Sequence, residues 1–218
     1  MGEFTFDENA ENKNKKEDIE WLNIWCEDTN DHSMPRIALI GDSITAQTYE
    51  IVKRELKDVA KIDYLATSYS ILSPTYVGMV ESFITDSNYE IIYFNYGLHG
   101  HGVGDDEYEN AYRNMLQKFL IRSKVIIGLT TTVLDKDNLD KESEVWSNKV
   151  KARNERAIKL ANEFNLYVDD LYEISQKLGR QGKTLDGVHF NEQGNELIGK
   201  SKAEAIKKVW FKTCKELG

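Results

Sequence analysis

The alternation of short apolar runs with longer amphipathic segments is the feature that most constrains the fold of this sequence. Apolar runs of strand length lie at residues 36–40, 62–66, 91–95, 124–130 and 166–168. Segments with helical spacing of apolar residues follow them, at 44–56, 75–85, 106–121, 146–164 and 191–211. Strands that alternate with helices form βαβ units, whose mostly parallel sheet is covered on both faces. The sequence therefore predicts a three-layer α/β/α fold with a five-stranded, mostly parallel sheet.

A change in composition defines where this domain begins. Residues 1–16 are polar and highly charged, which is typical of an N-terminal arm outside a packed core. Residues 17–27 carry apolar side chains near helical spacing, and they predict a short amphipathic helix that packs on the domain. A chain of 218 residues can bury one sizeable core, and no linker or internal repeat interrupts it. We expect a single domain at 17–218.

The charge balance limits the classes of partner. The chain has 28 Lys and Arg against 37 Asp and Glu, a formal net charge of −9 at pH 7. A protein that binds nucleic acid needs a basic stripe to displace the counterions of the phosphates. The lysine-rich segments here are interleaved with acidic or apolar residues. We expect no nucleic-acid partner, and the acidic balance also argues against an anionic membrane surface.

Neither a membrane span nor a leader segment is visible. No apolar run approaches the length that a bilayer requires, and the acidic, polar N-terminus has no apolar stretch of the signal type. The two cysteines are too few for a disulfide framework. These features predict a cytoplasmic protein, although a secreted protein whose signal peptide had been removed would look the same. They do not indicate an oligomeric state.

The topology of such a sheet predicts where a site lies. In the flavodoxin-like strand order 2-1-3-4-5, ligands bind beyond the carboxyl ends of the strands, where the order reverses between strands 1 and 3. The first strand runs into residues 41–43, and the third runs into residues 95–102. Three of the four histidines of the chain lie in 95–102 or in 186–189. This clustering predicts a site at the carboxyl edge of the sheet.

Ser43 occupies a position that suits a nucleophile. It lies in the run Gly41-Asp42-Ser43-Ile44-Thr45, on a tight turn between a strand and a helix. Its backbone N–H belongs to the free donors of the helix N-terminus, which can stabilise an oxyanion when the hydroxyl attacks a carbonyl. A structural alternative is that Ser43 is only a helix cap, a role in which serine is common.

Asp186 and His189 form a candidate acid–base pair. A serine hydroxyl is a weak nucleophile until a base takes its proton, and a carboxylate can fix the tautomer of a histidine base. Asp186 lies three residues before His189, directly ahead of the last helical segment. The spacing brings both side chains into one loop. The structural alternative is an Asp-Gly turn in which His189 has no chemical role.

Together, the runs GDSIT (41–45) and DGVHF (186–190) resemble the SGNH (GDSL-type) hydrolase family. The resemblance covers about residues 36–197. It implies a flavodoxin-like fold and hydrolysis of esters, often of acyl groups on carbohydrates or lipids. It also implies that Ser43 is the nucleophile and that Asp186 and His189 are the acid and base of a catalytic triad.

Two further blocks of the family are altered in this sequence. The family usually has a Gly after its second strand and an Asn after its third, both of which donate to the oxyanion. Ser68 is the nearest match to the Gly, and Gly97 begins the block in which His99 stands where Asn is expected. The sequence resembles a subgroup that carries this histidine. In this chain His99 could donate through a ring N–H, or Asn95 could supply the missing donor.

Other chemistries have weaker support. An α/β-hydrolase needs a G-x-S-x-G elbow, and the run here is G-D-S-I-T. His99 and His101 could ligate a metal, but no third ligand lies nearby in the sequence, and we predict no metal site. Arg153 and Asn154 lie on a long predicted helix from which they could reach the site, but we favour the interpretation that they belong to its solvated face.

The leading hypothesis is a serine ester hydrolase that works through an acyl-enzyme, without metal or organic cofactor. Its substrate would be a small-molecule or glycan ester, with acetyl on a sugar as the example that the family resemblance suggests. One alternative is an O-acyltransferase with the same triad, because the acceptor depends on water exclusion and pocket shape. Another is a non-catalytic carbohydrate-binding or interaction protein on the same scaffold, since fold does not determine function.

Overall fold

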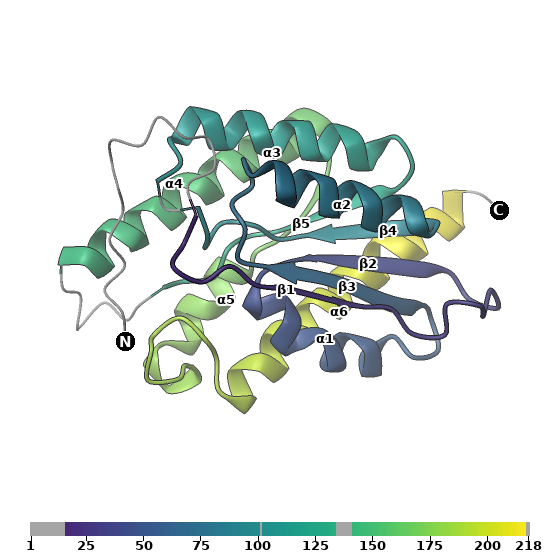
Figure 1. The fold of residues 1–218 in the computed structure, drawn as a ribbon. Helices are drawn as coiled ribbons and strands as arrows, with labels where there is room; N and C mark the ends of the chain where they lie inside the picture. The colour runs from purple at the N-terminus through teal and green to yellow at the C-terminus, as the bar shows by residue number, and fades with distance from the viewer. Residues whose placement is uncertain (1–15, 101, 134–140, 217–218) are drawn as a thin grey trace.

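The structure is a computed structural model that describes residues 16–100, 102–133 and 141–216. A six-stranded sheet lies between two layers of helices (Figure 1). The strands are β1 (Leu22–Trp25), β2 (Arg36–Gly41), β3 (Lys61–Thr67), β4 (Tyr89–Phe94), β5 (Lys124–Gly128) and β6 (Tyr167–Asp169). The helices are α1 (Ser43–Glu55), α2 (Pro74–Asp86), α3 (Asp105–Leu120), α4 (Lys141–Phe164), α5 (Leu171–Leu178) and α6 (Glu192–Glu216), with a short 3-10 turn, η1 (Arg180–Gly182).

The order of the strands confirms the predicted fold class. The sheet runs β1-β3-β2-β4-β5-β6, and every neighbouring pair is parallel except β1 with β3. Without β1 this is the flavodoxin-like order. The chain adds β3 on one side of β2 and then β4, β5 and β6 on the other side, so the strand order reverses between β2 and β4. The predicted count of five strands was wrong by one, because β1 adds an antiparallel strand at the edge.

The segment predicted as a helix at 17–27 contains this edge strand. Its residues pair with β3 from Leu22 opposite Thr67 to Trp25 opposite Tyr64. A short isolated helix is marginal in water, because nucleation fixes several residues before many hydrogen bonds form. Extended pairing instead satisfies the backbone groups along the outer edge of β3. Short apolar runs do not distinguish helix from strand by spacing alone, and here the free sheet edge decided the outcome.

Both faces of the central strands are buried, which explains their continuous apolar character. Ala38 and Ile40 of β2 pack toward α2, α3 and α4, whereas Ile37 and Leu39 belong to the core on the side of α1, α5 and α6 (Figure 1). Successive side chains of a strand point to opposite faces, so one apolar run supplies both cores. The carboxyl ends of the parallel strands are thereby held in one fixed edge.

Two smaller points complete the comparison with the predicted elements. The helix α5 is eight residues long, and the turn η1 that follows it was not predicted, because three residues are too few for a periodic pattern. The predicted N-terminal arm at 1–16 lies outside the described residues except for Lys16. Within the described part of the chain, no helix combines the length and the apolar character needed to cross a membrane.

Candidate active site

Ser43 lies at the carboxyl edge of the sheet, where β2 ends and α1 begins. Gly41 permits a close approach at this junction, because a Cβ there would lie 2.2 Å from Thr45 Oγ1. Asp42 is the N-cap of the helix, and its Oδ1 accepts a hydrogen bond from the N–H of Ile44 at 2.9 Å. As the first residue of the helix, Ser43 has an N–H without an acceptor in the helix itself. The turn therefore presents a hydroxyl and a backbone donor at the same point.

Asp186 organises the loop that precedes α6. Its Oδ1 accepts hydrogen bonds from the hydroxyl of Thr184 at 2.7 Å and from the N–H groups of Val188 and His189, both at 2.9 Å. Gly187 between them has a φ of 72°, a conformation that favours glycine. The loop thus has three donors on one carboxylate oxygen and leaves the other oxygen for the imidazole of His189.

The structure brings Ser43, His189 and Asp186 into one hydrogen-bonded series. Nε2 of His189 lies 2.8 Å from Ser43 Oγ, and Nδ1 lies 2.6 Å from Asp186 Oδ2. Burial alone would raise the pKa of Asp186, but the hydrogen bonds from His189, Thr184 and the backbone outweigh it and hold that pKa well below its ordinary value. An ionised carboxylate keeps the proton of a neutral imidazole on Nδ1, so Nε2 can accept the serine proton.

Lys183 connects this loop to the segment that follows β5. Its side chain is buried, and Nζ donates to the carbonyl oxygens of Thr132 at 2.6 Å and Val188 at 3.1 Å. The ammonium also lies 4.0 Å from the ring centroid of Phe190, with which Lys183 forms an isolated β-bridge. Burial lowers the pKa of Lys183 to about 8, against the opposite effect of the Asp186 carboxylate. No motif in the sequence pointed to this role of Lys183.

Arg153 holds the loop that follows β4. The residue is 1% exposed, and its guanidinium donates to the carbonyl oxygens of Gly97 at 2.9 Å, His99 at 2.7 Å and Gly100 at 2.6 Å. It also lies 4.7 Å from the ring centroid of Tyr108. The interpretation of this arginine as part of a solvated face was wrong, because the loop carbonyls replace the water that its charge would otherwise bind.

Two buried asparagines bind the backbone at the end of β5, one from the end of β4 and one from α4. The side-chain amide of Asn95 donates to the carbonyl oxygens of Gly128 at 2.8 Å and Leu129 at 3.0 Å. Asn154 accepts from the N–H of Thr130 and donates to its carbonyl oxygen, both at 2.8 Å. The solvated-face interpretation was therefore also wrong for Asn154. Both N–H groups of the Asn95 amide already have acceptors, so this structure does not leave Asn95 as a donor for an oxyanion.

Ser68 is engaged by the N-terminal segment, which we define as residues 16–21. Its backbone N–H donates to the carbonyl oxygen of Trp21 at 3.2 Å, and its hydroxyl donates to Glu20 Oε2 at 2.7 Å. Both donors of Ser68 therefore have acceptors in the N-terminal segment. The physical reason is the added edge strand, whose approach uses the donors at the end of β3.

His99, by contrast, retains a buried ring nitrogen without a hydrogen-bond partner among the described residues, namely Nε2. Its Nδ1 lies 3.0 Å from Glu17 Oε1 and 3.1 Å from Oε2. Of the four predicted oxyanion residues, Gly97 contributes a carbonyl to the Arg153 contact, and His99 alone offers an unused side-chain nitrogen. Glu17 was not singled out in the sequence.

No group of three or more His, Cys, Asp and Glu side chains suited to a metal ion occurs within the described ranges. The second histidine of the weighed metal motif, His101, lies outside those ranges.

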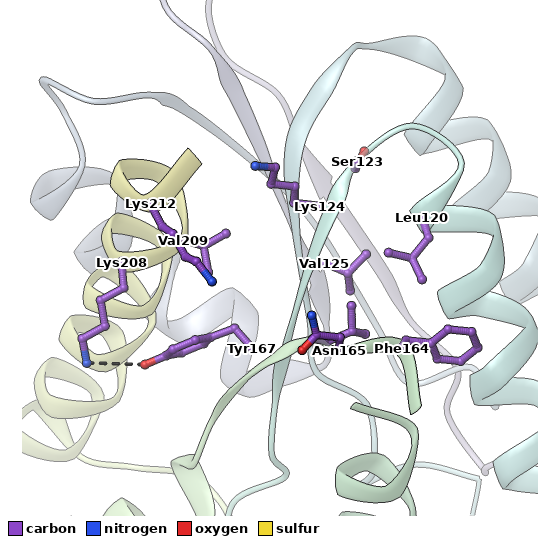
Figure 2. A pocket seen from close by; sticks show the side chains of 11 residues that line it. Leu120, Ser123, Lys124, Val125, Phe164, Asn165, Tyr167, Lys208, Val209 and Lys212 are labelled. Atoms are coloured by element: carbon purple, nitrogen blue, oxygen red, sulfur yellow. Dashed lines mark hydrogen bonds between the residues drawn. The ribbon is translucent and has the colours of Figure 1, made fainter. Parts of the chain in front are cut away.

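A cavity of about 640 Å³ lies elsewhere, at the start of β5 and beside α6 (Figure 2). Its lining includes Leu120, Lys124, Tyr167, Lys208 and Lys212, and Lys208 Nζ donates to the hydroxyl of Tyr167 at 3.4 Å. β5 begins at Lys124, so this cavity belongs to the amino edge of the strand, whereas Ser43 lies at the carboxyl edge of the sheet. None of the predicted site residues lines it.

Comparisons with known proteins identify the fold. No family model matches the chain, and no curated protein matches it by sequence. Among solved structures, an acetyl xylan esterase is 19% identical with a TM-score of 0.65, over 78% of this chain and 99% of that chain. A lipase/acylhydrolase from Enterococcus faecalis is 19% identical with a TM-score of 0.64, over 81% and 97%. A protein from Slackia heliotrinireducens, provisionally classed as an SGNH hydrolase, is 14% identical with a TM-score of 0.64, over 80% and 100%. The chain shares the three-layer fold of these proteins.

Proposed function

We propose that the chain is a serine ester hydrolase that removes a small acyl group, such as acetyl, from a carbohydrate or a similar small ester. The observation that carries the proposal is the series from Ser43 Oγ to His189 Nε2 at 2.8 Å and from His189 Nδ1 to Asp186 Oδ2 at 2.6 Å. A nucleophile, a base and a group that orients the base are all that acyl transfer through serine requires of side chains.

In the acylation step, neutral His189 takes the proton of Ser43 as Oγ forms a bond to the carbonyl carbon of the ester. The carbonyl oxygen becomes an oxyanion, and Asp186 stabilises the imidazolium that forms. His189 then gives the proton to the leaving alcohol oxygen as the ester C–O bond breaks. The acyl group remains on Ser43.

The oxyanion needs donors at the carboxyl edge of the sheet. The N–H of Ser43 is one, because it begins α1 and the helix N-terminus carries partial positive charge. Nε2 of His99 is the second that we propose, since the donors at Ser68 and Asn95 are used elsewhere. Donors at fixed positions stabilise the charge that develops on this oxygen in the transition state.

Deacylation repeats the sequence with water in place of the ester alcohol. His189 takes a proton from water, the water oxygen attacks the acyl carbon, and Ser43 leaves with the proton returned to it. The side chains of His189 and Asp186 are 32% and 50% exposed. Such access to solvent favours hydrolysis over transfer to another acceptor, because transferases exclude water from the acyl-enzyme.

The substrate class rests on the fold neighbours together with this open site. One matching structure is an acetyl xylan esterase and another is a lipase/acylhydrolase. The proposal for this chain is therefore an ester with a short acyl group on a sugar.

Reaction with a fluorophosphonate probe tests the proposed nucleophile directly. We expect a single covalent adduct in the folded protein, which peptide mapping assigns to Ser43, because only a serine activated by a base attacks the probe at a useful rate. Heat-denatured protein is the control and is expected to remain unlabelled. A folded protein that forms no adduct would contradict the proposal and favour a non-catalytic binding role.

The substrate and acceptor need a second measurement. Acetylated xylo-oligosaccharides are incubated with the protein, and released acetate is quantified with and without an added unacetylated glycan. Free acetate in both reactions is expected. Acetyl transfer to the glycan without free acetate would instead identify an acyltransferase, and neither product would contradict a sugar acetyl ester as substrate.

Replacing Lys183 with methionine is expected to lower kcat/KM for p-nitrophenyl acetate by about 10- to 100-fold, because a reacting group displaced by about 1 Å loses up to that factor. Methionine keeps the apolar volume but removes both donations, to Thr132 and to Val188. The loop that carries Asp186 and His189 is then less constrained. Steady-state kinetics and the rate of fluorophosphonate labelling measure the effect.

The control is Lys177→Met on α5, where the ammonium pairs with the exposed Glu173. That variant is expected to retain full activity. If Lys183→Met also retained it, Lys183 would have no role in positioning the loop.

A further inference from the structure

The described residues contain a second carboxylate–imidazole pair, separate from that of Asp186 and His189. Glu17 in the N-terminal segment holds Nδ1 of His99 at 3.0 and 3.1 Å through its two oxygens, and Oε1 also accepts from the N–H of Gly100 at 3.4 Å. The two side chains are only 11% and 16% exposed. A pair so withdrawn from water is a fixed part of the fold, unlike a solvated surface ion pair.

The orientation of the His99 ring is set from several sides. Glu17 fixes Nδ1, and the ring of Trp21 meets the imidazole edge-on at a centroid separation of 6.2 Å and an angle of 81°. The backbone of His99 is held by the bond from Arg153 of α4 to its carbonyl oxygen at 2.7 Å. The imidazole therefore has one position, with Nε2 buried and left without a partner among the described residues.

The topology places this ring at the same edge of the sheet as Ser43. His99 follows β4, and Ser43 follows β2, which is the neighbour of β4 in the sheet. The carboxylate of Asp42, the residue before Ser43, is near enough to raise the pKa of His99. The N-terminal segment uses the donors of Ser68 and at the same time supplies Glu17 to His99. One segment thus removes one candidate donor and orients another.

We propose that Glu17 is a positioning residue that holds His99 as an imidazolium, so that its Nε2–H donates to the oxyanion formed when Ser43 attacks an ester. This inference rests on the proposed function. It adds the N-terminal segment to the active site and makes the second oxyanion donor a cation.

The need for the charged form follows from proton positions. The carboxylate of Glu17 accepts the proton on Nδ1, so a neutral His99 has its only proton there and presents a lone pair at Nε2. A lone pair repels an oxyanion. His99 can donate at both nitrogens only when the ring carries both protons, and a charged donor is the stronger one.

The charges around His99 favour this form. Burial alone would lower the pKa of His99, but the hydrogen bond and charge of Glu17, together with the charges of Asp42 and Glu20, raise it above the usual value. Arg153 of α4 is the cation that contacts this loop, and its guanidinium donates to the carbonyl oxygen of His99. Its positive charge opposes the second proton on the His99 ring. Because the pKa is raised, the imidazolium persists at higher pH than for a free histidine and is lost as pH rises through the shifted pKa.

Activity is therefore expected to fall on the alkaline side as His99 loses its second proton. Glu17→Gln should move this decline to lower pH, because glutamine lacks the negative charge that favours the imidazolium. Its carbonyl oxygen, held at the Oε1 position by the N–H of Gly100, still lies beside Nδ1 and can accept the proton there. A neutral His99 in the variant then still presents a lone pair at Nε2.

The experiment measures kcat for p-nitrophenyl acetate against pH in the unmodified protein and in Glu17→Gln. We expect kcat of the variant to be about 10-fold lower at neutral pH, because less of His99 carries the second proton and a whole donor is worth about 10²–10³-fold. We also expect the alkaline decline to begin at a lower pH. In a His99→Asn background, Glu17→Gln should change kcat no further. Glu196→Gln, whose carboxylate pairs with Arg54 and Lys200 on the outer surface, is the matched control and should keep the unmodified profile.

A second readout does not depend on activity or on the stability of a variant. ¹H–¹⁵N spectra of the imidazole groups, with His99 assigned by its absence in His99→Asn, report which ring nitrogens carry protons. We expect both to be protonated up to a higher pH than in free histidine. A His99 that titrates at or below the free value, or an unchanged alkaline limb in Glu17→Gln, would overturn the inference while fluorophosphonate labelling of Ser43 still supported the esterase. Absence of labelling would remove the esterase and the oxyanion role together.

Discussion

Replacing Ser43 with alanine is expected to lower kcat for p-nitrophenyl acetate by about 10⁵- to 10⁶-fold, the range seen when a serine nucleophile is removed from a comparable triad. The substitution deletes the oxygen that forms the acyl-enzyme and leaves His189 without the proton that it would take. The residue is half-buried, so the expected change in the free energy of unfolding is small, on the order of one neutral hydrogen bond, about 1 kcal/mol. Steady-state kinetics and thermal unfolding of the purified variant measure the two effects.

The control for this variant is Ser82→Ala on the exposed face of α2, where no proposed chemistry occurs. It should retain full activity and should still form the fluorophosphonate adduct. A Ser43→Ala protein that turned over ester at more than about a hundredth of the unmodified rate would exclude the acyl-enzyme mechanism, since removal of a nucleophile leaves far less.

Asp186→Asn is expected to lower kcat by about 10⁴-fold while the loop keeps its conformation. Oδ1 of Asp186 accepts from Thr184 and from the N–H groups of Val188 and His189. An asparagine must use its only carbonyl oxygen for these three donors, so its NH₂ faces Nδ1 of His189. The imidazole then accepts at Nδ1 and carries its proton on Nε2, where it donates to Ser43 Oγ instead of accepting from it. The base is present in the wrong tautomer.

Kinetics and the rate of fluorophosphonate labelling measure this loss, and thermal unfolding checks that the loop remains folded. The matched control is Asp58→Asn, an exposed carboxylate that follows α1, which should behave as the unmodified protein. A loss of less than about 10-fold in Asp186→Asn would show that Asp186 does not fix the tautomer of His189, because that role carries an effect about a thousand times larger.

Much of the architecture follows from local pattern. The apolar runs at 36–40, 62–66, 91–95 and 124–130 predicted β2, β3, β4 and β5, because strands buried on both faces consist of continuous apolar residues. The alternation with helices then determined the layers and the position of the site at the carboxyl edge. The local pattern did not predict the edge strand β1, because its pairing depends on β3, more than 35 residues farther along the chain.

Within the candidate site, some residues could be recognised from the sequence and others could not, for the same reason. Asp186 and His189 belong to one loop, and Ser43 lies on a turn that a glycine and a helix start define, so their chemistry is visible in short motifs. Arg153 shares a helical face with Val150, Ala157 and Leu160, and this spacing was a signal that its side chain faces the interior. The charge of the residue favoured the opposite interpretation, because a charged side chain is rarely buried unless partners compensate it.

The sequence alone determined the order of β2 to β6 and of the helices between them, the edge of the sheet where a site lies and the three residues that now form one hydrogen-bonded series. Only the tertiary structure decided which donors remain for an oxyanion. It brought Glu17 to His99, Trp21 to Ser68 and Arg153 to the loop after β4. Spacing along the chain reports the conformation of one segment, whereas the free or occupied state of a hydrogen-bond donor depends on a second segment that the fold places against it.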